Sequence, residues 1–207
     1  MKRIGPRLAA IFAAALTLSL GLPLAVAPAS AETFWQRVIR GGHDRPGAGT
    51  QRMSNQSPIP RQTVRYDGPH GPNTIIVDTS ERRLYYTLGN GRAIKYGVGV
   101  GRDGFTWSGT NRITRKAEWP GWTPPPQMIR REAAKGRKLP AYMPGGPNNP
   151  LGARALYIGS TMYRIHGTNQ PWTIGQAMSS GCIRMANDDV VHLYGQVNVG
   201  TRVVVRH

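Results

Sequence analysis

Short runs of β-branched and aromatic residues, separated by glycine and asparagine, dominate the chain from residue 73 onward. The first run is 74–78 (TIIVD), and the second, 82–88 (RRLYYTL), ends at the turn residues 89–91 before a third run at 92–100. Strand-length runs joined by short turns of this kind are typical of a β-meander. The pattern therefore predicts antiparallel strands at the start of this region.

The same pattern continues toward the C-terminus and adds two helical segments. Further strands are predicted at 111–119, 155–159, 162–166 and 201–206. Short helices are predicted at 127–135 and 188–197, the second because Asn187 is a favourable N-cap and two aspartates follow in the first turn. Residues 140–150 carry four prolines and two glycines and are predicted to form a long loop. The predicted fold class is mostly β, a β-sandwich or meander, with one or two short helices.

The first 31 residues have the pattern of a secretory signal peptide. Three basic residues precede an apolar run at 8–20, and the residues at 29–31 (ASA) match a small-residue cleavage site. We expect export to the periplasm or cell envelope, with the mature chain starting at Glu32. Retention as a signal anchor stays open, because the apolar stretch 8–27 approaches the roughly 20 residues that span a membrane.

Residues 32–72 are rich in Gly, Pro, Ser, Gln and Arg and contain few apolar residues. Such a segment buries too little apolar surface to offset the entropy of ordering, so we expect a disordered basic linker. It serves either as a passive spacer or as an arm that contacts polyanions. The strand pattern begins at Asn73, and a single domain is expected over 73–207.

The chain is strongly basic, with a formal net charge of +17. A charge of this size favours polyanions, such as nucleic acid or the anionic polymers and lipid head groups of a cell envelope, but it also serves solubility alone. No recognisable nucleic-acid-binding module accompanies the charge, so nucleic acid is not an expected partner. No cluster with metal-ligand spacing occurs, and neither a metal nor another cofactor is expected.

Cys182 is the single cysteine of the chain and cannot form a disulfide within it. In an exported protein, such a cysteine indicates an intermolecular bridge or a free reactive thiol, and a buried inert side chain is the remaining alternative. A reactive thiol needs an imidazole within hydrogen-bond reach. His166 is the candidate, because it ends the predicted strand 162–166. A thiolate–imidazolium ion pair that reacts well below pH 8 is the expected resting state.

The residues around Cys182 fit nucleophilic catalysis as well. Ser179, Ser180 and Gly181 precede it, and such a loop lets backbone N–H groups approach a reacting carbonyl, as an oxyanion hole requires. Arg184 would stabilise a thiolate or bind a substrate carboxylate, and a solvated surface cation is the simpler alternative for it.

The segments around these residues resemble the L,D-transpeptidases of the YkuD type. HGT at 166–168 and SSGCIRM at 179–185 match the signature of that family, and the likeness extends over roughly 73–206. The supporting segments are TIIVDTSERRLYY, WPGWTPPPQMIRR, NNPLGARALYIG and NDDVVHLYGQV. The resemblance implies a YkuD-type catalytic fold. It also implies that Cys182 is the nucleophile, that His166 is the general base, and that the backbone carbonyl of Gly167 orients the imidazole.

Three further positions take roles from the same resemblance. Ser180 and Gly181, with the nucleophile, match the loop whose backbone lines the oxyanion hole, and Arg184 matches a position that steadies the loop or the substrate. One departure is Ser180, which stands where many members have histidine. A side-chain donor in the oxyanion hole is therefore in doubt here.

The family's substrates are peptidoglycan stem peptides, and the resemblance implies a two-step acyl transfer. The thiolate attacks the carbonyl of the L-centre of a diamino acid, the terminal D-alanine leaves, and a thioester remains. An amine of a second stem or of an envelope protein then takes the acyl group, which gives a 3-3 cross-link or a tethered protein and so contributes to cell wall organisation and cell shape. Water in place of the amine would make the enzyme an L,D-carboxypeptidase. A catalytically silent wall-binding module is the other alternative, and we expect a monomer.

Overall fold

The computed structural model describes residues 55–207. The predicted signal peptide, 1–31, and the first part of the predicted linker, 32–54, lie outside the described residues. Within the described part, no helix has the length and apolar character needed to cross a membrane.

The described residues form strands for the most part, with two short α-helices and one turn of 3₁₀ helix. The helices are α2 (Pro126–Ala133), η1 (Pro171–Thr173) and α3 (Asn187–Gln196). The strands are β1 (Gln62–Arg65), β2 (Thr74–Asp78), β3 (Arg83–Gly89), β4 (Arg92–Gly97), β5 (Val100–Gly101), β6 (Gly109–Glu118), β7 (Arg154–Ile158), β8 (Arg164–His166), β9 (Ala177–Ser179), β10 (Ile183–Arg184) and β11 (Arg202–Arg206). The predicted fold class, mostly β with one or two short helices, is confirmed.

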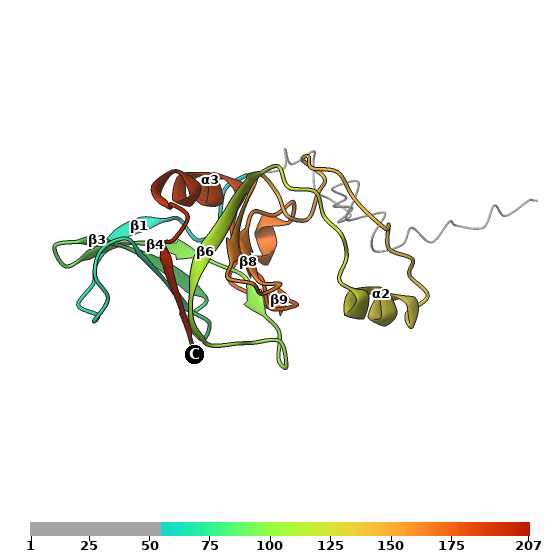
Figure 1. Cartoon of the computed structure of the whole chain (residues 1–207), viewed down its shortest axis with the longest axis horizontal. Coiled ribbons are helices and arrows are strands. Elements are labelled where there is room, and N and C mark those ends of the chain that lie inside the picture. The colour runs from blue at the N-terminus through green and yellow to red at the C-terminus, as the bar shows by residue number, and fades with distance from the viewer. Residues whose placement is uncertain (1–54) are drawn as a thin grey trace, which may run out of the picture. The chain divides into compact units, whose positions relative to one another are not determined.

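The strands join in the order β1-β4-β3-β2-β11-β6-β7-β8-β10, and β5 pairs separately with β9. The long strand β6 links two parts of this sheet. Its first half pairs with β11, its second half pairs with β7, and the register shifts between Ile113 and Arg115. Irregularities of this kind bend a strand, so β6 can turn from one layer into the other. Figure 1 shows β6 crossing the molecule between the two groups of strands.

One apolar core serves both groups of strands. Ile75 and Val77 of β2 are fully buried and belong to the same cluster as Leu156 of β7 and Ile165 of β8. α3 adds Val190 and Leu193 to this cluster. The β-branched runs in the sequence therefore have the role that their pattern predicts, which is to fill the space between the strand layers. The core thus fixes β8, the strand that carries His166.

Residues 55–72 differ from the expected disordered linker. β1 pairs antiparallel with β4 at the edge of the sheet, and the Tyr66 N–H donates to Gly91 O at 2.7 Å. Arg61 Nη1 lies 3.0 Å from Asp189 Oδ1 of α3. Backbone hydrogen bonds and this ion pair supply the order that the few apolar side chains do not. Edge pairing uses backbone groups, which any residue except proline carries in full, so composition gives no signal of it.

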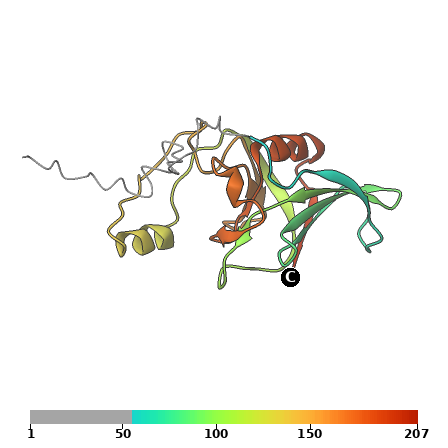
Figure 2. The same ribbon diagram turned by 180° about the vertical axis from the view of Figure 1, so that it is seen from behind.

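α2 lies on the long connection between β6 and β7, residues 119–153, here called the excursion. A proline in its first turn starts the helix, where a missing N–H costs nothing. The base of the excursion is closed by two backbone hydrogen bonds between Trp122 and Met143, each 2.8 Å long, and by Asn149 Nδ2, which donates to Pro144 O at 2.9 Å. Figure 1 and Figure 2 show α2 at the end of this excursion, beyond the strands. The predicted helix and the predicted long loop are both present.

Asn187 does not cap α3 as predicted. It is the first residue of the helix, and the cap position, Ala186, makes no side-chain hydrogen bond to the helix. Asn187 Oδ1 instead accepts hydrogen bonds from Ala153 N at 3.0 Å and from Thr168 N at 3.2 Å. A Cβ at Gly167 would lie 2.3 Å from the same oxygen, which explains why glycine stands there. Asn187 thus ties the segment after His166 to α3.

Substituting Asn187 by alanine tests this tie. Asn187→Ala leaves two buried N–H groups without an acceptor, and each such group costs about 1–3 kcal/mol. We expect the free energy of unfolding to fall by about 2–5 kcal/mol in urea titrations followed by tryptophan fluorescence. Asn198 is exposed, and Asn198→Ala should stay within about 0.5 kcal/mol of the parent chain. Equal stability of the two variants would contradict the role given to Asn187.

Candidate active site

A short parallel pairing sets the strand that ends at His166 beside the strand that follows Cys182. β8 and β10 lie side by side, with Ile165 opposite Ile183 and His166 opposite Arg184. Cys182 immediately precedes β10. The Arg164 and Arg184 cations act on the pKa of both His166 and Cys182, so the two side chains lie in the same charged surroundings.

His166 is held in one tautomer by its neighbour. The side chain is buried, with 4% of its surface exposed, and its Nδ1 lies 2.6 Å from the Gly167 carbonyl oxygen. Because a carbonyl only accepts hydrogen bonds, Nδ1 carries the proton and Nε2 keeps its lone pair. Burial, with the nearby Arg184 cation, lowers the pKa of His166 to about 3. The imidazole is therefore uncharged at neutral pH, with Nε2 able to accept a proton.

The Cys182 thiol is also uncharged at rest. Its Sγ lies 3.8 Å from the Met162 carbonyl oxygen. Burial raises the pKa of the thiol, and the Arg164 and Arg184 cations, which act in the opposite direction, do not cancel this effect. The expected thiolate–imidazolium ion pair is therefore wrong for the resting site. The physical reason is that removing both groups from water penalises the two charged forms together.

The loop before Cys182 is shaped by hydrogen bonds of its own. Ser179 Oγ accepts from the Gly181 N–H at 3.1 Å and donates to the Cys182 carbonyl oxygen at 2.6 Å. Gly181 has φ of +102°, and a Cβ there would lie 2.4 Å from the Tyr163 ring, so only glycine fits. The Gly181 N–H is engaged within the loop, which differs from its expected place among the oxyanion donors. Ser180 and Cys182 are the remaining backbone donors of the predicted set.

Trp107 is a part of the site that the sequence did not predict. Its Nε1–H donates to the Gly181 carbonyl oxygen at 3.0 Å, and its ring stacks on Tyr163 with centroids 4.7 Å apart and planes 6° from parallel. The Gly181 carbonyl and the Cys182 N–H belong to one planar peptide group. Trp107 therefore fixes the direction in which the Cys182 N–H points. Trp107 comes from the β5–β6 connection, and no local motif links it to the loop.

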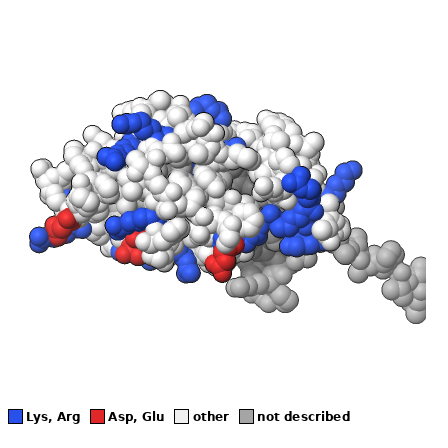
Figure 3. Space-filling model, turned by 60° about the horizontal axis from the view of Figure 1, so that its bottom comes forward, with Lys and Arg blue, Asp and Glu red and all other residues white. Residues whose placement is uncertain are grey.

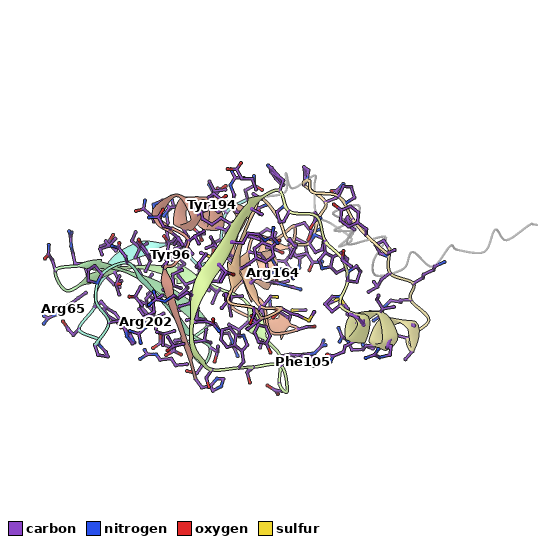
Figure 4. The ribbon with its side chains drawn as sticks, in the orientation of Figure 1. Arg65, Tyr96, Phe105, Arg164, Tyr194 and Arg202 are labelled. Atoms are coloured by element: carbon purple, nitrogen blue, oxygen red, sulfur yellow. The ribbon has the colours of Figure 1, made fainter. Side chains whose placement is uncertain are left out.

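Positive charge surrounds the thiol. Arg184 of β10 and Arg164 of β8 both act on the pKa of Cys182, and Arg164 lies over the Tyr157 ring at 5.2 Å. Figure 4 shows Arg164 on β8, in the middle of the strand layers. The face in Figure 3 likewise carries basic side chains at many positions and acidic ones at few. This surrounding disfavours an imidazolium and favours an anion bound at or near the sulfur.

Two other histidines bond to partners of their own. His192 Nδ1 lies 2.9 Å from the Tyr96 hydroxyl, and His207 Nδ1 lies 2.7 Å from Thr79 Oγ1. Over residues 55–207, no three His, Cys, Asp or Glu side chains form a group that could hold a metal ion.

Comparison with known proteins gives a family match over most of the described region. Residues 72–205 match the model of YkuD, the L,D-transpeptidase catalytic domain. The chain is 40% identical over 159 residues to the probable L,D-transpeptidase ErfK/SrfK of Escherichia coli, which covers 74% of this chain and 50% of that protein. It is 41% identical over 150 residues to the probable L,D-transpeptidase YbiS of the same organism, which covers 70% of this chain and 47% of that protein. The chain thus spans about half the length of these curated relatives.

A solved structure shares the fold. An L,D-transpeptidase from Mycobacterium smegmatis superposes with a TM-score of 0.51 at 18% sequence identity, over 65% of this chain and 58% of that one. At this level of identity the likeness concerns the arrangement of the strands and helices.

The charge state of the site has a direct test in alkylation. The thiolate is the reactive form, and the pKa of Cys182 is raised above its ordinary value of about 8.5. We expect the rate of reaction with iodoacetamide to be low at pH 7 and to rise with a single inflection above pH 8.5. Mass spectrometry of the quenched chain measures the rate. An inflection well below pH 8 that disappears in His166→Ala would show a resting ion pair instead.

Proposed function

Because the chain belongs to the L,D-transpeptidase family of the YkuD type, we propose that it is a cysteine acyltransferase acting on peptidoglycan stem peptides. The observation that supports the proposal is the β8–β10 pairing, which sets the strand that ends at His166 beside the strand that starts one residue after Cys182, with the imidazole hydrogen-bonded to the Gly167 carbonyl. These are the groups that thiol-based acyl transfer needs, namely a nucleophile, a base and a third group that fixes the tautomer of the base.

The first half of the proposed reaction forms a thioester. As Cys182 Sγ attacks the carbonyl carbon of the L-centre of the diamino acid, His166 Nε2 takes the thiol proton. The backbone N–H groups of Ser180 and Cys182 donate to the oxygen that becomes negative. The carbon–nitrogen bond to the terminal D-alanine then breaks, His166 returns its proton to the departing amine, and the acyl group stays on sulfur.

The second half releases the acyl group to an amine. His166, again uncharged, removes a proton from the incoming amine as its nitrogen attacks the thioester carbonyl, and the sulfur leaves as the thiol after accepting that proton. An amine on another stem gives a 3-3 cross-link, and an amine on an envelope protein gives a tethered protein. Water as acceptor gives L,D-carboxypeptidase activity.

The resting charge state bears on both proton transfers. A base whose pKa lies near 3 is unprotonated at neutral pH, but it is a weak base toward a thiol whose pKa is raised, because a general base is most effective when its pKa lies near the operating pH. Once protonated, the same imidazole is a strong acid, because burial and Arg184 both disfavour the charged form. It therefore hands its proton readily to the leaving amine.

The proposal includes export and action as a monomer in the periplasm or cell envelope, where stem peptides occur. The predicted signal peptide over 1–31 supports export.

Incubation with a stem tetrapeptide that ends in D-alanine tests the proposal. The full chain should release D-alanine, gain the mass of the acyl group, and yield peptide dimers. Cys182→Ala should abolish all three products, and His166→Ala should slow acylation by about 10²- to 10⁴-fold. Acylation by a carbapenem, read as an adduct mass on Cys182, provides a second readout that needs no acceptor.

The control is His70→Ala, which removes an imidazole from the segment before β2 and should keep the parent rate. D-alanine without dimers, in the presence of excess acceptor stem, would assign the chain as a carboxypeptidase. If the folded parent chain forms neither an acyl-enzyme nor a product, the proposed activity is wrong. The alternative of a catalytically silent wall-binding module then takes its place.

A further inference from the structure

We infer that Arg102 and Arg131 form a carboxylate-binding site beside the nucleophile loop, and that this site holds a carboxylate of the donor stem peptide. The inference rests on the proposed function and adds to it the residues that recognise the charge of the donor.

Both arginines reach the loop that carries the nucleophile, from different parts of the fold. Arg131, on α2, places Nη2 3.5 Å from Ser180 Oγ. Arg102 follows β5, and its backbone N–H donates to the Ser179 carbonyl oxygen at 3.2 Å. The chain thus brings two guanidinium groups to the residues that immediately precede Cys182.

One aromatic ring holds the two cations close to each other. The guanidinium carbon of Arg102 lies 4.6 Å from the centroid of the Phe105 ring, and that of Arg131 lies 5.8 Å from the same centroid. In Figure 4, which has the orientation of Figure 1, Phe105 lies below β9, on the side of the strands toward α2. A rigid apolar surface of this kind fixes two flexible side chains at little entropic cost.

Each of the two guanidinium groups has a buried N–H donor that makes no hydrogen bond to the described residues. In Arg102 this donor is Nη2, which has no hydrogen-bond partner there. In Arg131 it is Nε, which makes no hydrogen bond there either but lies 3.5 Å from Glu132 Oε1, and Glu132 also accepts hydrogen bonds from Arg137. Buried donors without an acceptor are costly, so the site favours an incoming anion.

Mutual repulsion of the two arginines acts in the same direction. Burial lowers the pKa of Arg102, and the Arg131 cation lowers it further. Holding like charges together costs free energy, which an anion between them removes. A carboxylate matches the planar fork of a guanidinium and can accept from two of them at once.

The donor stem has a carboxylate close to the bond that is broken in the proposed reaction. Its terminal D-alanine has a carboxylate next to the bond that Cys182 breaks, and a diamino acid such as diaminopimelate carries a second one. Because Arg131 belongs to α2, binding of either carboxylate would also hold the excursion against the nucleophile loop. Amidation of one carboxylate at a time distinguishes the two sources.

Kinetics with three tetrapeptides test the inference. The free peptide, its C-terminal amide and the peptide amidated on the diamino acid side chain are compared by product release, as D-alanine or D-alaninamide. With the free peptide, Arg102→Gln and Arg131→Gln should each lower kcat/KM by about 10- to 100-fold, mainly through KM. Amidation of the recognised carboxylate should lower the parent kcat/KM by a similar factor and remove most of the difference between parent and variants. The amide that has this effect identifies the source.

The matched control is Arg130→Gln, on the same helix and exposed. It removes the same charge from α2 and should change kcat/KM by less than twofold. If both site variants keep the parent kcat/KM for the free peptide, or if they lower it equally for all three peptides, the inference is overturned.

Binding without turnover separates this inference from the proposed function. Calorimetry with Cys182→Ala, which cannot form a thioester, should show tighter binding of the free peptide than of one amide, and a second substitution, Arg102→Gln, should remove that preference. A parent chain that releases no D-alanine while Cys182→Ala shows this preference would overturn the proposed function and leave the anion site standing. Equal affinity for the three peptides would overturn the site alone.

Discussion

The pairing of β8 with β10 is the constraint on which the site depends. Only two residue pairs make up its ladder, yet it sets the imidazole-bearing strand against the residues that follow the thiol. Its stability comes from its surroundings. Ile165 and Ile183 are buried in the core, and Gly99 exchanges two backbone hydrogen bonds with Arg184, at 2.9 and 2.8 Å. Cys182 is therefore placed by backbone bonding on both sides of β10, and its position does not rely on its own weak hydrogen bond.

Charge and burial around this frame leave His166 and Cys182 uncharged at rest. The cations near the sulfur oppose protonation of His166, and burial opposes ionisation of Cys182. In the proposed reaction a proton moves from sulfur to nitrogen while negative charge develops on the substrate oxygen. The backbone donors and cations near that oxygen would stabilise this charge and so favour the transition state over the ground state.

The sequence was sufficient to predict the elements that carry strong hydrophobic patterns. β2, β3 and β11 coincide with β-branched runs, and both helices appear close to their predicted limits. The short strands β5, β9 and β10 were not predicted, because two or three residues are too few to show a period. β1 was missed because edge pairing needs no apolar side chains.

The catalytic roles predicted for Cys182 and His166 stay predictions, and the charge state predicted for the pair is wrong. Cys182 and His166 are sixteen positions apart in the sequence, and the β8–β10 pairing sets the strand that ends at His166 beside the strand that follows Cys182. The pKa of each depends on burial and on neighbouring cations, which are tertiary properties. Trp107, Arg102 and Arg131 come from parts of the chain some 50 to 80 residues before the nucleophile, and only the folded structure brings them to the loop.

The protonated state of Cys182 also bears on how long a lone sulfur survives. Formation of sulfenic acid and exchange with disulfides both proceed through the thiolate, so a thiol whose pKa is raised is slow to be oxidised. In an oxidising compartment such as the proposed cell envelope, the burial that disfavours ionisation of Cys182 would therefore also slow the oxidation of its sulfur.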